Sequence, residues 1–159
     1  DKGLGVASAV IIASLITSNT ATKSLKLDNN VLCGIQPGLR YGTGSVGAYT
    51  AEGIAGLAEA LKVNQTLQSV SIGSNKITGD EAEQLAKVVL EHPSLTDFCG
   101  IPLVSMRDNS LTELDLSGKG IGVPGAIVLS HLLPTASALK SLDLENNVLI
   151  NQVQKLVKF

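Results

Sequence analysis

The chain has few charged and few aromatic residues. Only 16% of its 159 residues are charged and 3% are aromatic, and tryptophan is absent; charged residues make up about 25% of an ordinary soluble domain. The core must therefore be built from leucine, valine, isoleucine and alanine. The formal net charge of −2 gives no basic field that would attract nucleic acid or an anionic membrane, so we expect no nucleic-acid partner.

Cysteines and long hydrophobic runs are also scarce. The two cysteines, Cys33 and Cys99, are too few for the disulfide framework of small secreted domains, although a single bridge stays open. We expect two reduced, partly buried thiols in an intracellular protein. The apolar run at 8–16 is about half as long as a membrane-spanning helix, so we predict no transmembrane segment.

Internal repetition is what the chain does have. The stretch SLKLDNNVL at 24–32 returns as SLDLENNVL at 141–149, with seven of nine residues identical at an offset of 117. Over the longer ranges 2–32 and 119–149, 15 of 31 residues are identical. A match of this length without gaps indicates a protein built from repeated units.

A shorter motif lies inside this long repeat. Its form is Leu-x-x-apolar-x-apolar, and its period of two predicts short strands. The strands are expected near 22–28, 67–73, 95–101, 111–117 and 139–145. The starts of these strands are 45, 28, 16 and 28 residues apart, so two steps are regular and two are not.

A helix is predicted between successive strands. Leu129, Leu132 and Leu133 have the i, i+3, i+4 spacing of one helical face. The residues TGDE at 78–81 have the pattern of a capping box at a helix start. The step of 16 residues is too short for a helix after its strand, so we expect none there.

These patterns resemble a leucine-rich-repeat array of the ribonuclease-inhibitor type, with repeats of about 28 residues, and are similar to arrays of unicellular algae. LTELDLSGKGIG and LKSLDLENN carry the resemblance, which covers nearly the whole chain. It implies one α/β domain over 1–159, a right-handed solenoid with parallel strands on its concave side and helices on its convex side. In such a fold Asn30, Asn75 and Asn147 would satisfy backbone groups where each strand turns out of the sheet.

The first long step contains an insertion at 33–49. It includes Gly42-x-Gly44-x-x-Gly47 ahead of a predicted helix at 51–62, which is formally the dinucleotide-binding fingerprint. The residues before it, GIQPGLRY, do not form a buried strand. We therefore interpret the insertion as a glycine-rich surface loop and predict no cofactor.

Metal and catalytic sites are not predicted. Cys33 and Cys99 occupy different places in the repeat, and no close ligand spacing links them to the two histidines, His92 and His131. Both histidines are expected to face solvent. The Ser, His and Asp residues have no catalytic context, so we predict a non-enzymatic protein.

The strand residues that alternate with buried leucines form the candidate partner-binding face. Their charge changes from basic near the first strand to acidic near the last, which fits a complementary protein surface. Cys99 is expected beside Asp97 on this face. The candidate residues are Lys23, Lys26, Gln68, Ser71, Asp97, Glu113, Asp115, Lys140, Asp143 and Glu145.

We therefore expect a protein–protein interaction module or scaffold whose partner is another protein. One alternative is a structural subunit inside a larger multi-protein or membrane-associated assembly, and another is a solvated face without a partner. At the N-terminal end, Val10, Ile11 and Ile12 leave little room for the polar cap that an array needs. We expect this stacking face to be covered by further repeats or by a partner chain.

Overall fold

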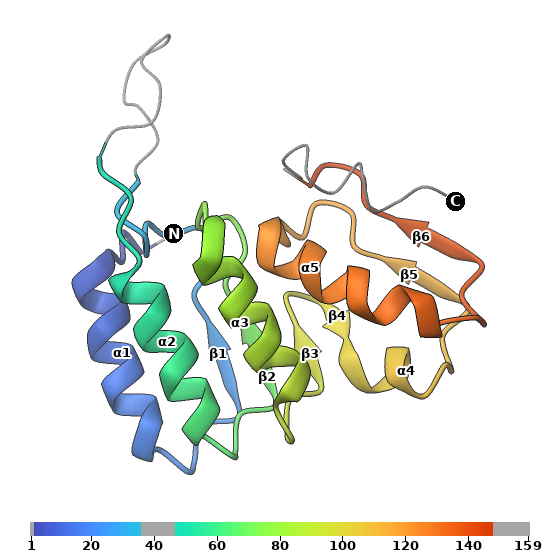
Figure 1. Cartoon of the computed structure of the whole chain (residues 1–159), viewed down its shortest axis with the longest axis horizontal. Coiled ribbons are helices and arrows are strands. Elements are labelled where there is room, and N and C mark those ends of the chain that lie inside the picture. The colour runs from blue at the N-terminus through green and yellow to red at the C-terminus, as the bar shows by residue number, and fades with distance from the viewer. Residues whose placement is uncertain (1, 36–46, 148–159) are drawn as a thin grey trace, which may run out of the picture.

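Short strands alternate with helices along the chain (Figure 1). The computed structural model describes residues 2–35 and 47–147. In these ranges the helices are α1 (Val6–Ser18), α2 (Glu52–Val63), α3 (Gly79–Glu91), α4 (Leu103–Arg107) and α5 (Gly122–Leu132), with a 3-10 turn at Leu133–Thr135. The strands are β1 (Ser24–Lys26), β2 (Ser69–Ser71), β3 (Asp97–Phe98), β4 (Ile101–Pro102), β5 (Glu113–Asp115) and β6 (Ser141–Asp143).

The strands form two sheets. β1, β2 and β3 are parallel, with Leu25 opposite Val70 and Val70 opposite Phe98. β4 runs back antiparallel to β3, and β5 and β6 make a separate parallel pair. The predicted α/β class with parallel strands and intervening helices is confirmed.

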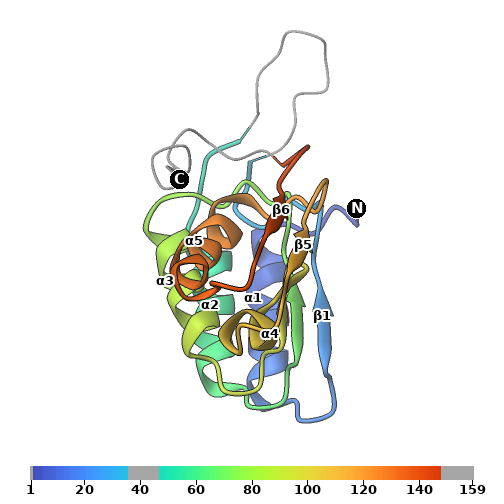
Figure 2. The ribbon, with the colours of Figure 1, turned by 90° about the vertical axis from the view of Figure 1, so that its right-hand side faces the viewer.

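The helices form a continuous layer although the strands do not. α1 packs on α2, α2 on α3, and α3 directly on α5. Figure 2 shows α2, α3 and α5 on one side of the molecule and β1, β5 and β6 on the opposite side. The segment from β3 to α4 therefore interrupts the strand layer and leaves the helix layer intact.

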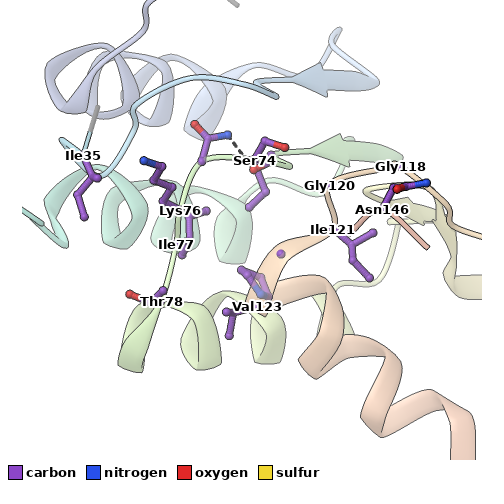
Figure 3. A pocket seen from close by; sticks show the side chains of 14 residues that line it. Ile35, Ser74, Lys76, Ile77, Thr78, Gly118, Gly120, Ile121, Val123 and Asn146 are labelled. Carbon is purple, nitrogen blue, oxygen red and sulfur yellow. Dashed lines mark hydrogen bonds between the residues drawn. The ribbon is translucent and has the colours of Figure 1, made fainter. Parts of the chain in front are cut away.

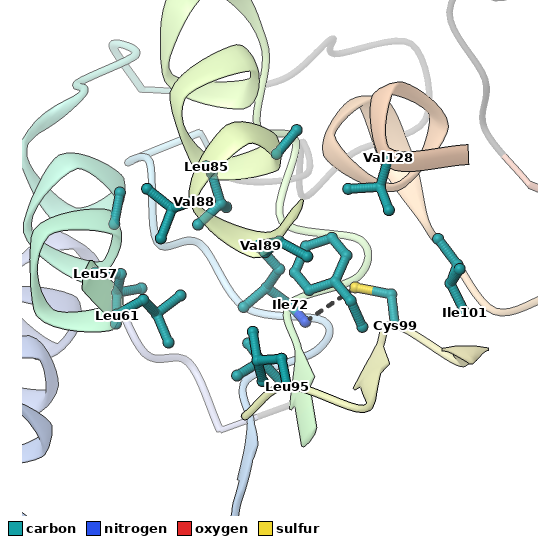
Figure 4. Close-up of a cluster of buried hydrophobic side chains, with 14 of the residues drawn as sticks. Leu57, Leu61, Ile72, Leu85, Val88, Val89, Leu95, Cys99, Ile101 and Val128 are labelled. Carbon is teal, nitrogen blue, oxygen red and sulfur yellow. Dashed lines mark hydrogen bonds between the residues drawn. The ribbon is translucent and has the colours of Figure 1, made fainter. Parts of the chain in front are cut away.

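The core lies between these layers (Figure 4). Leu61 and Leu85 from the helices and Ile72 and Leu95 from the strand side are each at most 4% exposed. Burying a side chain of this size contributes about 1.5–3 kcal/mol. The periodic leucines of the sequence thus supply one shared core, which a single strand–helix unit could not form alone.

The short third step differs from its prediction because it does contain a helix, α4. β3 reverses into β4 through Cys99 and Gly100, whose φ angles of 52° and 85° match a two-residue type I′ hairpin loop. The reversal also turns the Cys99 side chain inward, where it is 2% exposed. The expectation that Cys99 lies on the strand face was therefore wrong.

The predicted architectural role of the asparagines is confirmed. The Nδ2 of Asn75 donates to the carbonyls of Leu27, Ile72 and Gly73, at 2.8, 2.8 and 3.1 Å. Asn147 does the same for Leu116, Leu144 and Glu145 at 2.7, 3.1 and 3.3 Å. These amides satisfy carbonyls at the ends of two successive strands, so they join neighbouring repeats.

The capping box at 78–81 is only half correct. Thr78 does precede α3, but its side chain makes no capping hydrogen bond. The Tyr49 hydroxyl instead donates to the Thr78 carbonyl at 2.9 Å and lies 3.2 Å from Glu81 Oε2. The same hydroxyl accepts from Thr78 N–H at 3.4 Å, and this N–H is the group that the Glu81 carboxylate would bind in a capping box.

Candidate interaction surfaces

The first half of the candidate strand face lies along β1, β2 and β3. Lys23, Lys26 and Gln68 are exposed on it. Ser71 and Asp97 are half-buried, because the Ser71 hydroxyl donates to Asp28 Oδ1 at 2.6 Å and Asp97 Oδ1 accepts from the Ser69 hydroxyl at 3.2 Å. These two side chains are held in place, while the lysines and the glutamine are open to a partner.

The second half lies along β5 and β6 and is mostly acidic. Asp115 is directly opposite Asp143 in the parallel register. Asp115 is exposed, and hydrogen bonds from the Ser117 hydroxyl and N–H to Oδ1, at 2.6 and 2.8 Å, lower the pKa of its carboxyl. The other exposed members are Glu113, Lys140, Asp143 and Glu145.

The acidic half is not neutralised by ion pairs in the described part of the chain. The ion pair found there joins Lys62 and Glu59 on α2, away from the strands. Like charges opposite one another in a sheet destabilise it. The structure brings these acidic residues together on β5 and β6, which form a different sheet from the one that carries Lys23 and Lys26.

A pocket of about 520 Å³ lies where the loops after β2 and β5 meet the starts of α3 and α5 (Figure 3). Its wall is largely apolar, and Ile77, Ile121 and Val123 are among the residues that line it. The loops touch at Gly120, whose carbonyl accepts from Ser74 N–H at 3.0 Å. A Cβ at Gly120 would lie 2.4 Å from Ser74 Oγ, and the φ angle of 63° at this position also favours glycine.

Sequence reasoning did not predict this pocket. The alternating glycines Gly118, Gly120 and Gly122, all at φ near 60°, were a local signal for an unusual loop. Nothing in the sequence showed that this loop approaches the one at Ser74, because the two are separated by a whole repeat and the β3–α4 segment. The pocket has the shape and chemistry to receive an apolar group.

Apolar side chains are exposed on α1. Ile11 is 60% exposed, Leu15 is 64% exposed and Val10 is 37% exposed. No residue of α1 is charged. Ser14, Thr17 and Ser18 are also exposed, so the helix has some polar surface, although Val10 and Ile11 leave little room for it as the sequence indicated.

The thiols offer no reactive centre. Cys33 and Cys99 are both free and buried, deeper than the partial burial that we predicted. Burial raises the pKa of both, that of Cys99 to about 12, so each is protonated at neutral pH. Cys33 Sγ donates to the Asn75 carbonyl at 2.9 Å, and within the described residues no cluster of His, Cys, Asp and Glu could hold a metal ion.

We expected His92 to face solvent, but it is buried. It is 5% exposed and ends α3 at the position that Asn64 has after α2. Its Nδ1 accepts from the N–H groups of Ser94 and Leu95 at 3.3 and 3.2 Å, so the proton of the neutral ring is on Nε2. His131, in contrast, is exposed as predicted.

The pKa of His92 is lowered. Burial is the main cause, and the backbone carbonyls of Asn64 and Leu61 act weakly in the opposite direction. Within the described residues Nε2 reaches no acceptor in hydrogen-bond geometry. His92 is therefore a structural group at the junction of α3 and β3, and not a member of the strand face.

The glycine fingerprint lies mostly outside the part of the chain that the structure describes. Gly42 and Gly44 lie outside the described residues, and Gly47 lies five residues ahead of α2. Among the helices described here, none combines the length and the apolar character required to cross a bilayer.

Comparison with known proteins gives matches to longer proteins. A Rho GTPase-activating protein, gacW of Dictyostelium discoideum, is 27% identical over 126 residues, which are 67% of this chain and 11% of that protein. A Tonsoku-like protein of Danio rerio is 29% identical over 109 residues, 59% of this chain and 8% of its own length. The chain thus spans no more than 11% of these relatives.

A solved structure, Leiomodin-1 Actin-Binding Site 2, is 22% identical with a TM-score of 0.45, and the match covers 60% of this chain and 47% of that one.

The family model described as Leucine Rich repeat matches residues 63–86 and 107–130. The first match covers β2 and most of α3, and the second covers β5 and most of α5. These are the parts of the chain where a short parallel strand is followed by a full helix on a leucine core. The chain therefore contains leucine-rich repeats in these two stretches.

Proposed function

We propose that this chain is a non-enzymatic protein–protein interaction module or scaffold that binds its partner through the strand face. In this proposal the chain is a single domain, a right-handed solenoid whose strands line the concave side and whose helices line the convex side. The separation of strands and helices in Figure 2 supports it, as does the right-handedness of nearly all parallel β-α-β connections.

The charge distribution on the strand face carries the proposal. Glu113, Asp115, Asp143 and Glu145 are exposed together on β5 and β6 without an ion pair in the described part of the chain. Residues that keep like charges opposite one another at a cost in stability fit a surface selected for binding. A basic surface on a partner protein would relieve this repulsion and speed association.

The remaining candidate residues extend the same face. Lys23, Lys26 and Gln68 would contact a less basic part of the partner, and Lys140 would mark the edge of the acidic half. Ser71 and Asp97 would act as a fixed, hydrogen-bonded floor. The net charge of −2 and the acidic half support a protein rather than a nucleic acid as partner.

Charge reversal tests the proposal. In the variant Glu113→Lys, Asp115→Lys, Asp143→Lys we expect loss of the partner in affinity purification from the source organism, quantified against the unmodified chain. Glu83→Lys, Glu91→Lys, on the exposed side of α3, is the matched control and should retain it. Retention of the same partner by the strand-face variant, or its equal loss in both variants, would contradict the proposal.

A second function is favoured by a different observation. The exposed apolar side chains of α1 suit a structural subunit packed into a larger multi-protein or membrane-associated assembly. In that case the N-terminal stacking face would be covered by further repeats or by a partner chain. Leu15→Lys should then abolish assembly, whereas the strand-face variant should leave it unchanged.

A further inference from the structure

The position of Leu15 is buried in every other long helix. Leu15, Ala60, Val88 and Leu132 each lie seven residues before the start of a strand motif, at Thr22, Leu67, Leu95 and Leu139. Ala60, Val88 and Leu132 are 4%, 5% and 6% exposed, whereas Leu15 is 64% exposed. The three buried residues belong to α2, α3 and α5, each of which packs on the preceding long helix. This position is therefore one that a preceding helix covers.

The chain also contains a covered copy of α1. At the offset of 117 residues, Ile11 and Leu15 correspond to Val128 and Leu132 of α5. Val128 is 0% exposed, compared with 60% for Ile11. α5 packs on α3. Because α1 and α5 are similar in sequence, a helix like α3 should also fit the exposed surface of α1.

The strand next to α1 is open in the same way. β1 is the outermost strand of its sheet, whereas its copy, β6, pairs with β5. The N–H groups of Lys140 and Ser141 donate to the Thr112 carbonyl of the neighbouring repeat, at 2.8 and 3.3 Å. The corresponding groups of β1 are those of Lys23 and Ser24.

The asparagines give a third, independent sign. Asn75 and Asn147 each donate to a carbonyl of the preceding repeat, Leu27 and Leu116, at 2.8 and 2.7 Å. Asn30 Nδ2 donates to carbonyls of its own repeat, those of Leu27 and Asp28, both at 3.0 Å. Asn30 Oδ1 accepts from Leu4 N–H at 3.0 Å, as Asn147 Oδ1 accepts from Ile121 N–H at 3.1 Å. Only the donor side of the Asn30 amide therefore differs, because it does not reach a carbonyl of a preceding repeat.

We infer that α1 and the open edge of β1, together named the α1–β1 face, dock a further leucine-rich repeat that resembles residues 79–117. A helix like α3 packs against Ile11 and Leu15, and a strand like β5 pairs with β1. A face that calls for both a helix and a parallel strand fits a repeat unit better than a lone helix, a lipid surface or the α1 helix of a second copy. This inference rests on the proposed covering of the N-terminal stacking face and is independent of partner binding by the strand face.

The experiment supplies that repeat. A second copy of residues 67–118 is placed directly before Lys2, which reproduces the junction between Gly118 and Lys119. Amide hydrogen exchange at Lys23 and Ser24, followed by NMR, should slow by roughly tenfold or more relative to the original chain. Leu15→Lys should lower the urea midpoint of the extended chain and leave that of the original chain unchanged.

Val63→Lys is the matched control, because Val63 is 59% exposed on α2 and should behave alike in both chains. The inference is overturned if exchange at Lys23 and Ser24 is unchanged, or if Leu15→Lys has the same effect in both chains. It is also overturned if the added copy stays unfolded by circular dichroism, or if a dimer abolished by Leu15→Lys persists in the extended chain. These readouts report on backbone pairing at the edge of β1 and on packing against α1, and none measures partner binding by the side chains of the strand face. Their failure therefore leaves the proposed interaction module untouched.

Discussion

Residues 2–32 and 119–149 have nearly half of their sequence in common, yet 2–32 and the described part of the second range, 119–147, lie in different surroundings. In the second range, α5 is covered by α3 and β6 pairs with β5. In the first, α1 and β1 form the outer end of the described structure. The same apolar positions are consequently buried in one range and exposed in the other, as Leu132 at 6% and Leu15 at 64% show.

This difference teaches that burial in a repeat protein belongs to the interface between repeats. A helix sequence such as that of α1 specifies two apolar surfaces, one toward its own strand and one toward the preceding helix. The side of α1 that faces α2 is also covered: Ala9 and Ala13, which lie against Gly53 and Gly56 of α2, are 0% and 5% exposed. Burial of the surface toward the preceding helix depends on whether another unit is present.

The largest expected effect tests this contrast directly. Leu132→Ala should lower the free energy of unfolding by ~2–5 kcal/mol, because it leaves a cavity between α5 and α3. Leu15→Ala removes an exposed side chain and should change it by less than ~0.5 kcal/mol. Urea denaturation followed by circular dichroism measures both. Equal losses for the two variants would mean that the two helices do not differ in burial as described.

A smaller effect is expected from substitution of the asparagines. Its size should differ between Asn75 and Asn147, because the two side chains differ in burial. Asn75 is 2% exposed and satisfies three carbonyls, so Asn75→Ala should cost ~1–3 kcal/mol. Asn147 is half-buried, and water can replace its amide, so Asn147→Ala should cost less. The same urea measurement applies, and a larger loss at Asn147 would contradict a role that scales with burial.

The smallest expected effect concerns His92, the residue that ends α3. The depressed pKa of His92 means that the unfolded chain binds a proton more readily than the folded one. The contribution of His92 to stability should be complete above the unfolded pKa of about 6.5. It should be lost as the pH falls from there through the lower folded pKa.

Asparagine at this position removes the titration. Asn64 Oδ1 accepts from the N–H groups of Thr66 and Leu67, both at 2.9 Å, as His92 Nδ1 does from its own pair. His92→Asn should therefore fold normally and have a shallower decline in thermal stability between pH 7 and pH 5. His131→Asn, at an exposed site, is the matched control. An unchanged pH profile in His92→Asn would show that the ring is not buried in its neutral form.

The sequence predicted the regular parts of this molecule well. The alternation of Leu114 and Leu116, the helical spacing of Leu129 and Leu132, and the asparagine after the strand are local patterns. Each reflects a backbone period or a backbone group that must be satisfied close by. The strand-face residues were predicted from the same alternation along the strand. Cys99 is the exception, because its side chain turns inward at the hairpin.

Only the tertiary structure decided how these units meet. It set the return of β3 through Cys99 and Gly100, the break between the two sheets, the pocket beside Gly120 and the burial of His92. Sequence by itself determined which side of each helix and strand is apolar, because that depends on residue spacing along one element. Which apolar side is covered depends on contacts between residues a whole repeat or more apart, and spacing within one element does not contain that information.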